Sequence, residues 1–149
     1  MILWRLTAPE HAPGLDGEGA RLWGGRWNSP GVAVVYASGA LSLAVLETWV
    51  HLPPPMRRPD AWPPRVAVRI ALPEGEAPEA VEGMDLADRA GLRAFGDAWA
   101  RERRSLALAV PSAVVPPERN VILNPAHPGM AGVRVLGVEP FAFDPRLAG

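Results

Sequence analysis

The alternation of apolar and polar residues along the chain predicts several short strands. Residues 65–72 alternate cleanly and place Val66, Val68 and Ile70 on one side, as in a half-buried strand. Residues 32–36 follow a Pro-Gly turn and form the clearest run of β-branched residues. Weaker strand patterns cover residues 2–6, 21–28, 106–110, 119–123 and 133–143, of which 21–28 is interrupted by Gly24-Gly25.

Two longer stretches have helical character. Residues 40–51 are apolar nearly all round, which predicts a buried helix that begins after Ser38 as its N-cap and ends at a triple proline. Residues 86–104 predict a second helix, which Gly91 or Gly96 could break. No internal repeat or linker divides the chain, so the pattern predicts a single domain of the α+β class.

Composition narrows the chemistry available to this domain of residues 1–149. The chain has no cysteine and no lysine, and all 15 of its positive charges are arginine. Disulfides, thiol nucleophiles and Schiff-base chemistry are therefore excluded. The net charge of −1 gives no electrostatic reason to expect direct nucleic-acid binding. The three histidines are scattered without metal-ligand spacing, so no metal site is predicted.

The chain shows neither of the sequence signals that would direct it to a membrane. It has no run of about 20 apolar residues, and its first residues lack the pattern of a signal peptide. We therefore predict a cytoplasmic protein with no membrane association.

Glu47 is the one carboxylate of the apolar helix predicted at residues 40–51. A carboxylate on an apolar face must be satisfied by a cation or by several hydrogen bonds. Arg5 and Arg26 are the candidate partners in the N-terminal third of the chain. Alternatively, Glu47 lies at the edge of the helix and reaches water, and periodicity alone does not choose between these interpretations.

The block Gly24-Gly25-Arg26-Trp27-Asn28 contains residue types that suit a dinucleotide. Glycine lets the backbone approach a phosphate, arginine binds a phosphate with two hydrogen bonds, and tryptophan offers a flat apolar wall to a ring. The block lacks the spacing of a Rossmann fingerprint. A glycine bulge between two strands, with Arg26 on the surface, is the alternative interpretation.

Three further polar residues are structural if each is considered alone. Tyr36 ends a predicted strand, where most tyrosines are core or rim residues. Ser112 has no nucleophile-elbow context, and Asn124 before Pro125 is typical of a turn.

Taken together and in order, these segments resemble the RES family, which is named for an arginine, a glutamate and a serine. The resemblance spans about residues 2 to 128, and its motifs are Trp4-Arg5, Gly24-Gly25-Arg26-Trp27-Asn28, Tyr36-Ala37-Ser38, Ala44-Val45-Leu46-Glu47, Val110-Pro111-Ser112 and Asn120-Val121-Ile122-Leu123-Asn124-Pro125. It implies a compact fold like that of ADP-ribosyltransferases, with two small, mostly antiparallel β-sheets and flanking helices.

The resemblance also implies roles for individual residues. Arg26, Glu47 and Ser112 match the three residues that name the family, and we expect them to be catalytic. A second set, expected to line the NAD⁺ site, comprises Arg5, Trp27, Tyr36 and Asn124. No cofactor or metal is expected beyond NAD⁺ as substrate.

The function implied is that of the toxin in a toxin–antitoxin pair that depletes NAD⁺ by cleaving the nicotinamide–ribose bond. Water as acceptor would give a glycohydrolase, phosphate a phosphorylase, and a protein side chain an ADP-ribosyltransferase. The expected partner is an antitoxin with an Xre-like helix-turn-helix domain, which would form an oligomeric complex with the toxin. The toxin would then contact DNA only through this partner. The alternatives from other classes are a non-catalytic domain that binds a nucleotide or a protein, and a purely structural domain.

Overall fold

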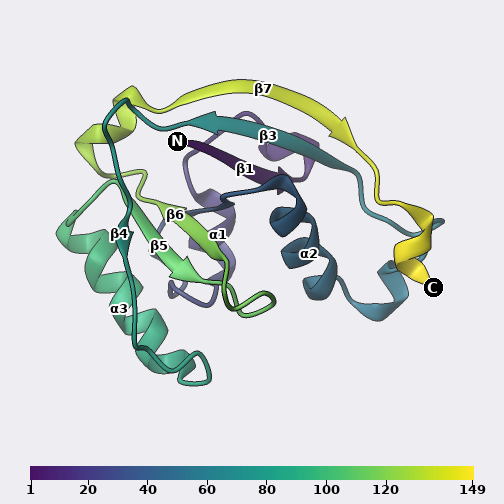
Figure 1. Cartoon of the computed structure of the whole chain (residues 1–149), viewed down its shortest axis with the longest axis horizontal. Coiled ribbons are helices and arrows are strands. Elements are labelled where there is room, and N and C mark those ends of the chain that lie inside the picture. Colours follow the sequence, from purple (N-terminus) through teal and green to yellow (C-terminus); the bar gives the residue numbers. More distant parts are fainter.

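The computed structural model describes all residues 1–149 as one sheet with three helices (Figure 1). The strands are β1 (Ile2–Thr7), β2 (Val35–Ser38), β3 (Arg65–Ala71), β4 (Glu79–Ala80), β5 (Ala107–Pro111), β6 (Arg119–Leu123) and β7 (Arg134–Phe141). The helices are α1 (Glu18–Trp23), α2 (Leu41–His51) and α3 (Arg89–Glu102), with short 3-10 turns at Pro9–His11, Pro54–Met56, Pro128–Gly132 and Pro145–Ala148. No helix has the length and apolar character needed to cross a lipid bilayer.

The α+β class is confirmed, but the expectation of two separate sheets is wrong. The seven strands form one sheet in the order β4-β5-β6-β2-β1-β3-β7, antiparallel throughout except for the short β4–β5 pair. Its middle is narrow, because β1 and β2 pair at a single register position, Trp4 opposite Ser38. In Figure 1, β1, β3 and β7 consequently lie together above β5 and β6 as two lobes of the same sheet.

The two faces of the sheet bury separate hydrophobic clusters. One cluster contains Leu3, Val35 and Ile70. The other contains Trp27, Ile122 and Trp99, the last of which belongs to α3. Alternation along the strands explains this division, because neighbouring residues of a strand point to opposite faces. In β2, for example, Val35 belongs to the first cluster while the next residue, Tyr36, packs against the second.

Three local predictions are wrong, one in the type of element and two in its boundaries. The strand expected at residues 21–28 is replaced by helix α1, whose Glu18 and Arg21 form an i,i+3 ion pair that stabilises a helical turn. The strand expected at residues 32–36 is displaced to β2, and residues 32–34 precede it. Helix α3 is unbroken, and it begins only at Arg89 because the Asp88 side chain caps it there by accepting a hydrogen bond from the backbone N–H of Gly91.

Helix α3 holds the Gly24–Asn28 block in place through very close contact. A Cβ at Gly96 would lie 1.8 Å from the carbonyl oxygen of Trp27, so only glycine fits where the helix meets this backbone. At the next residue of the helix, the buried carboxylate of Asp97 accepts hydrogen bonds from the backbone N–H and the hydroxyl of Ser29, at 2.8 and 2.6 Å. The glycine expected to break this helix is therefore the residue that allows it to dock.

Replacing Gly96 by alanine should lower the free energy of unfolding by about 3 kcal/mol, because the new methyl group must displace either the helix or the Trp27 backbone. The matched control is Gly19→Ala in helix α1, where a Cβ would meet no atom within 4 Å. Urea denaturation of both variants measures the difference. Equal stability of Gly96→Ala and the parent protein would contradict the close docking.

Candidate functional site

A cavity of about 340 Å³ is lined by residues of β1 and β2 at and beside their single pairing position. This volume is within the range of small-molecule sites. Its walls come from β1, β2, the Gly24–Trp27 loop, α2 and the ends of β5 and β6. The lining residues are Trp4, Arg5, Leu6, Gly24, Gly25, Arg26, Trp27, Tyr36, Ala37, Ser38, Ala44, Glu47, Thr48, His51, Val110, Pro111, Ala113 and Asn120.

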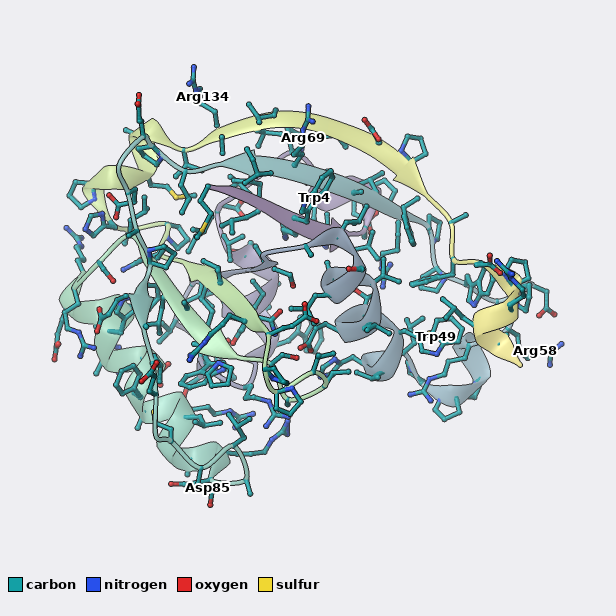
Figure 2. The ribbon with its side chains drawn as sticks, viewed as in Figure 1. Trp4, Trp49, Arg58, Arg69, Asp85 and Arg134 are labelled. Atoms are coloured by element: carbon teal, nitrogen blue, oxygen red, sulfur yellow. The ribbon has the colours of Figure 1, made fainter.

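Helix α2 contributes one stripe of side chains to this cavity. Its lining members, Ala44, Glu47, Thr48 and His51, recur at the i, i+3, i+4 and i+7 spacing of a single helical face. Trp49 is not among these lining residues, and it anchors the helix elsewhere. Its ring packs edge-on against Trp62 and Phe143 at centroid distances of 6.0 and 5.2 Å. Figure 2 shows Trp49 on the side of the molecule where the C-terminal segment ends. The aromatic contact thus fixes the helix that carries Glu47.

Two neutral donors, rather than an arginine, satisfy the Glu47 carboxylate. The hydroxyl of Ser112 and the side-chain amide of Asn120 both donate to its Oε1, at 2.6 and 2.7 Å. Its other oxygen, Oε2, has no hydrogen-bond partner in the protein. The partners expected from the sequence, Arg5 and Arg26, line the same cavity but form no ion pair with it. The expectation of an arginine pair is therefore wrong, although the three charged groups do share one cavity.

Ser112 lies behind the cavity wall and is completely buried. Its Oγ accepts hydrogen bonds from the backbone N–H groups of Val114 and Val115, at 3.1 and 2.9 Å, and gives its only proton to Glu47. Both its donor and its acceptor capacity are thus used. This geometry does not support the expectation that Ser112 is itself a catalytic residue, because the residue reaches the cavity only through Glu47.

Asn120 and Ser38 are site residues that sequence reasoning missed. Asn120 lies in β6, directly opposite Ser38 of β2, and the Ser38 hydroxyl donates to the Asn120 Oδ1 at 2.7 Å. Ser38 was expected to cap the following helix, but its side chain is turned to this hydrogen bond and α2 has no side-chain cap. The available signal was positional: both are polar residues near one end of a strand whose remaining buried positions are apolar.

The two cavity arginines are held by backbone carbonyl groups. Arg5 donates from Nη1 to the carbonyl oxygen of Gly14 at 2.8 Å, and Arg26 donates from Nη1 to that of Leu86 at 2.9 Å. Burial lowers the pKa of Arg5 from its usual value, and the nearby Asp16 partly offsets this effect. Neither guanidinium forms an ion pair, so no carboxylate in contact neutralises its charge, and its remaining N–H groups are available to a ligand.

Tyr36 joins the cavity wall to the glycine-rich loop. Its hydroxyl donates to the Oδ1 of Asn28 at 2.7 Å and accepts from the backbone N–H of Trp27 at 3.0 Å. A Cβ at Gly25 would lie 2.6 Å from this hydroxyl, so the glycine makes the contact possible. The hydroxyl therefore anchors the loop, and the part of Tyr36 available to a ligand is its ring.

Two residues expected to bind substrate are mainly structural. Trp27 borders the cavity, but it is 2% exposed and its ring packs edge-on against Phe95. Asn124 does not reach the cavity: it is buried, donates to the carbonyl oxygen of Ala100 at 2.9 Å and accepts from the backbone N–H of Ala126. The expectation that Asn124 lines the substrate site is therefore wrong, and Asn124 is a turn residue. The aromatic wall of the cavity comes from Trp4 and Tyr36.

The comparisons with known proteins agree with the motif analysis. Residues 2–144 match the RES domain family. The "Prs ADP-ribosylating toxin" of Sphingobium sp. (strain YBL2) is 38% identical over 97% of this chain and 94% of its own length. "Toxin Res" of Yersinia enterocolitica is 32% identical, with 99% of both chains covered. A chain of the Mycobacterium tuberculosis MbcT–MbcA toxin–antitoxin complex superposes with a TM-score of 0.71 at 19% identity, covering 99% of this chain and 86% of that one, which shows a common fold.

The hydroxyl of Tyr36, the only tyrosine, should titrate far above the usual range, because burial raises its pKa to about 12. In the unfolded chain the pKa of a tyrosine is about 10. The neutral form is thus favoured in the folded state, and this contribution to stability is complete below about pH 10 and is lost as the pH rises toward 12. Absorbance at 295 nm, followed together with circular dichroism, measures the titration.

The control is Tyr36→Phe, which should be less stable at neutral pH by about 1–2 kcal/mol because Asn28 and the Trp27 N–H each lose a partner. Its free energy of unfolding should also fall less steeply between pH 10 and 12. Ionisation of Tyr36 near pH 10 with native circular dichroism would contradict the buried anchor.

Proposed function

Because the chain belongs to the RES family of toxins, we propose that it is the enzymatic toxin of a toxin–antitoxin pair and that it cleaves the nicotinamide–ribose bond of NAD⁺ in the cytoplasm. The observation that carries this proposal is the arrangement of charges in the cavity. Glu47 presents an oxygen without a protein partner, and two arginines without ion pairs lie on the walls of the same space.

This arrangement suits the charge distribution of NAD⁺. The pyrophosphate is anionic, and Arg5 and Arg26 can bind it through charge-assisted hydrogen bonds. The nicotinamide and adenine rings are flat, and Trp4 and Tyr36 offer aromatic surface in the cavity. The ribose that carries the positively charged nicotinamide ring then lies against the single carboxylate of the lining, Glu47. The cavity thus has a complementary group for each part of the substrate near the scissile bond.

The bond that breaks joins C1′ of the ribose to the ring nitrogen of nicotinamide. Both electrons of the bond go to that nitrogen, so nicotinamide leaves as a neutral molecule and needs no proton from an acid. Positive charge develops on the ribose as the bond lengthens, as in other glycosidic cleavages. The negative charge of Glu47 stabilises this charge electrostatically. Water then forms the new C1′–O bond and loses one proton, giving ADP-ribose.

Inorganic phosphate could replace water in the last step and would give ADP-ribose 1″-phosphate by the same attack at C1′. A protein side chain could also serve as acceptor, and one observation favours this second candidate function: the Sphingobium relative is named an ADP-ribosylating toxin. Since all three acceptors attack the same carbon, the cavity residues keep the same roles. The products distinguish the three reactions.

Purified protein should consume NAD⁺ and release nicotinamide, and Glu47→Gln should reduce the rate at least about 100-fold, as removal of an electrostatic stabiliser does. This substitution keeps an oxygen that can accept from Ser112 and Asn120. The fold should therefore be retained, while the free carboxylate oxygen is replaced by an uncharged NH₂ group. Product analysis by mass spectrometry, with and without phosphate and with added cell lysate, identifies the acceptor.

The matched control is Glu139→Gln, which changes an exposed carboxylate of β7 outside the cavity and should leave the rate unchanged. Arg26→Ala should raise KM, whereas Arg134→Ala, an exposed arginine of β7, should not. Bound but unchanged NAD⁺ in a folded sample would contradict the enzymatic proposal and would indicate a non-catalytic binding domain. Normal turnover by Glu47→Gln would exclude the role given to this residue.

We further propose that an antitoxin with an Xre-like helix-turn-helix domain covers the cavity in an oligomeric complex. The support is the structural neighbour, which was solved as a toxin–antitoxin complex. Expression of the chain alone should arrest growth, and co-expression of a small helix-turn-helix protein encoded beside it should relieve the arrest. The two proteins should co-elute in size-exclusion chromatography, and the complex should no longer consume NAD⁺.

The control for that experiment is Glu47→Gln, which should not arrest growth but should still bind the antitoxin. A neighbouring protein that relieves the arrest while leaving NAD⁺ consumption by the purified complex intact would contradict coverage of the cavity.

A further inference from the structure

We propose that Asn120 is a positioning residue for Glu47 and that Ser38 fixes the orientation of its amide, so that the free carboxylate oxygen points into the cavity. The role in catalysis rests on the proposed function, whereas the contact itself does not. The three side chains come from β2, β6 and α2 and form a chain in which the Ser38 hydroxyl donates to Asn120 and Asn120 donates to Glu47, with 2.7 Å at each step.

The orientation of the Asn120 amide decides whether this chain helps or harms. An amide presents an acceptor on one side and a donor on the other, and only the NH₂ side can bind the carboxylate of Glu47. The reverse orientation would place Oδ1 of Asn120 against a carboxylate oxygen and would leave Ser38 without its acceptor. Ser38 is 4% exposed, and its hydroxyl donates to Oδ1 of Asn120. This hydrogen bond favours the orientation in which the NH₂ group of Asn120 faces Glu47.

The backbone around Asn120 makes this a rigid platform. Asn120 lies opposite Ser38 in β2 on one side and opposite Val110 in β5 on the other. Ser38 is in turn the residue that pairs with Trp4 at the one junction between β1 and β2. The positioning pair therefore lies at the narrow middle of the sheet, where hydrogen-bonded strands flank both residues.

The two donors to Glu47 act on the same oxygen from different elements. Ser112 approaches from the turn after β5 and is locked by two backbone N–H groups, while Asn120 approaches from β6. Two donors on Oε1 restrict rotation of the carboxylate plane, and Oε2 is left for the substrate. Loss of either donor would let the carboxylate rotate, which lowers its ability to stabilise charge at one defined position.

The kinetic test compares Asn120→Ala, Ser38→Ala and Asn120→Asp in the NAD⁺ assay. Asn120→Ala should lower kcat about 10- to 100-fold, as loss of a supporting hydrogen bond to an active group does, while KM stays within about twofold. Ser38→Ala should have a smaller effect in the same direction. The matched control is Asn124→Ala, which removes a buried asparagine outside the cavity and should change stability but not kcat.

Asn120→Asp gives a readout that a purely structural role would not produce. At neutral pH the new carboxylate faces Glu47 and repels it, so kcat should be low. At lower pH one proton is shared by the pair and the hydrogen bond to Glu47 can form again, so kcat should recover relative to the parent protein. A parallel pH profile for the variant and the parent would overturn the positioning role.

Nuclear magnetic resonance tests the contact without any turnover. The side-chain amide protons of Asn120 should shift when Glu47 is replaced by alanine, and they should not shift in Arg134→Ala. An Asn120 amide that does not respond to Glu47→Ala would overturn the inference whether or not the protein consumes NAD⁺. Conversely, a responsive amide in a protein that leaves NAD⁺ intact would refute the proposed reaction and support the contact.

Discussion

The site depends on charges that are held by neutral groups and so are not cancelled by one another. Glu47 is fixed by a hydroxyl and an amide, and Arg5 and Arg26 are fixed by backbone carbonyl groups. An ion pair between them would have satisfied all three but would have removed the charge that a ligand can use. Hydrogen bonds to neutral dipoles orient each group at low cost and leave its charge in place. The cavity therefore presents charges of both signs whose orientations are fixed by the protein.

The sheet provides this arrangement by being nearly divided. If β1 and β2 paired along their whole length, the space between them would be closed, but they pair only where Trp4 meets Ser38. The same junction supplies residues to the site, since Trp4 and Arg5 come from one strand and Tyr36 and Ser38 from the other. The cavity thus depends on how these two strands pair. Helix α2 lies against it and contributes Glu47, whose carboxylate accepts hydrogen bonds from Ser112 and Asn120.

Sequence reasoning located the charged residues but not their partners. The arginine–glutamate grouping followed from motif order and from the cost of a carboxylate on an apolar helix. The sequence could not reveal that Ser112 and Asn120 satisfy Glu47, because these donors are 65 and 73 residues away along the chain. Helix α1 was missed because its apolar pair Leu22-Trp23 is exposed, with Trp23 at 82%, so hydrophobicity there does not report burial. Strand periodicity located β3 well but could not show that its sheet continues through a single junction into β2.

The position of Ser112 has a consequence for how such a site works. A serine next to a glutamate in a cavity suggests a nucleophile and its base, yet here the serine has no free lone pair and no access to the cavity. Attack by its oxygen would require breaking a hydrogen bond that a backbone N–H of Val114 or Val115 donates to the hydroxyl in the turn after β5. The same bonds explain why serine suits this position: one small hydroxyl closes a turn and aims one proton at Glu47. The glutamate is therefore the group that faces the cavity, and the serine reaches the cavity only through it.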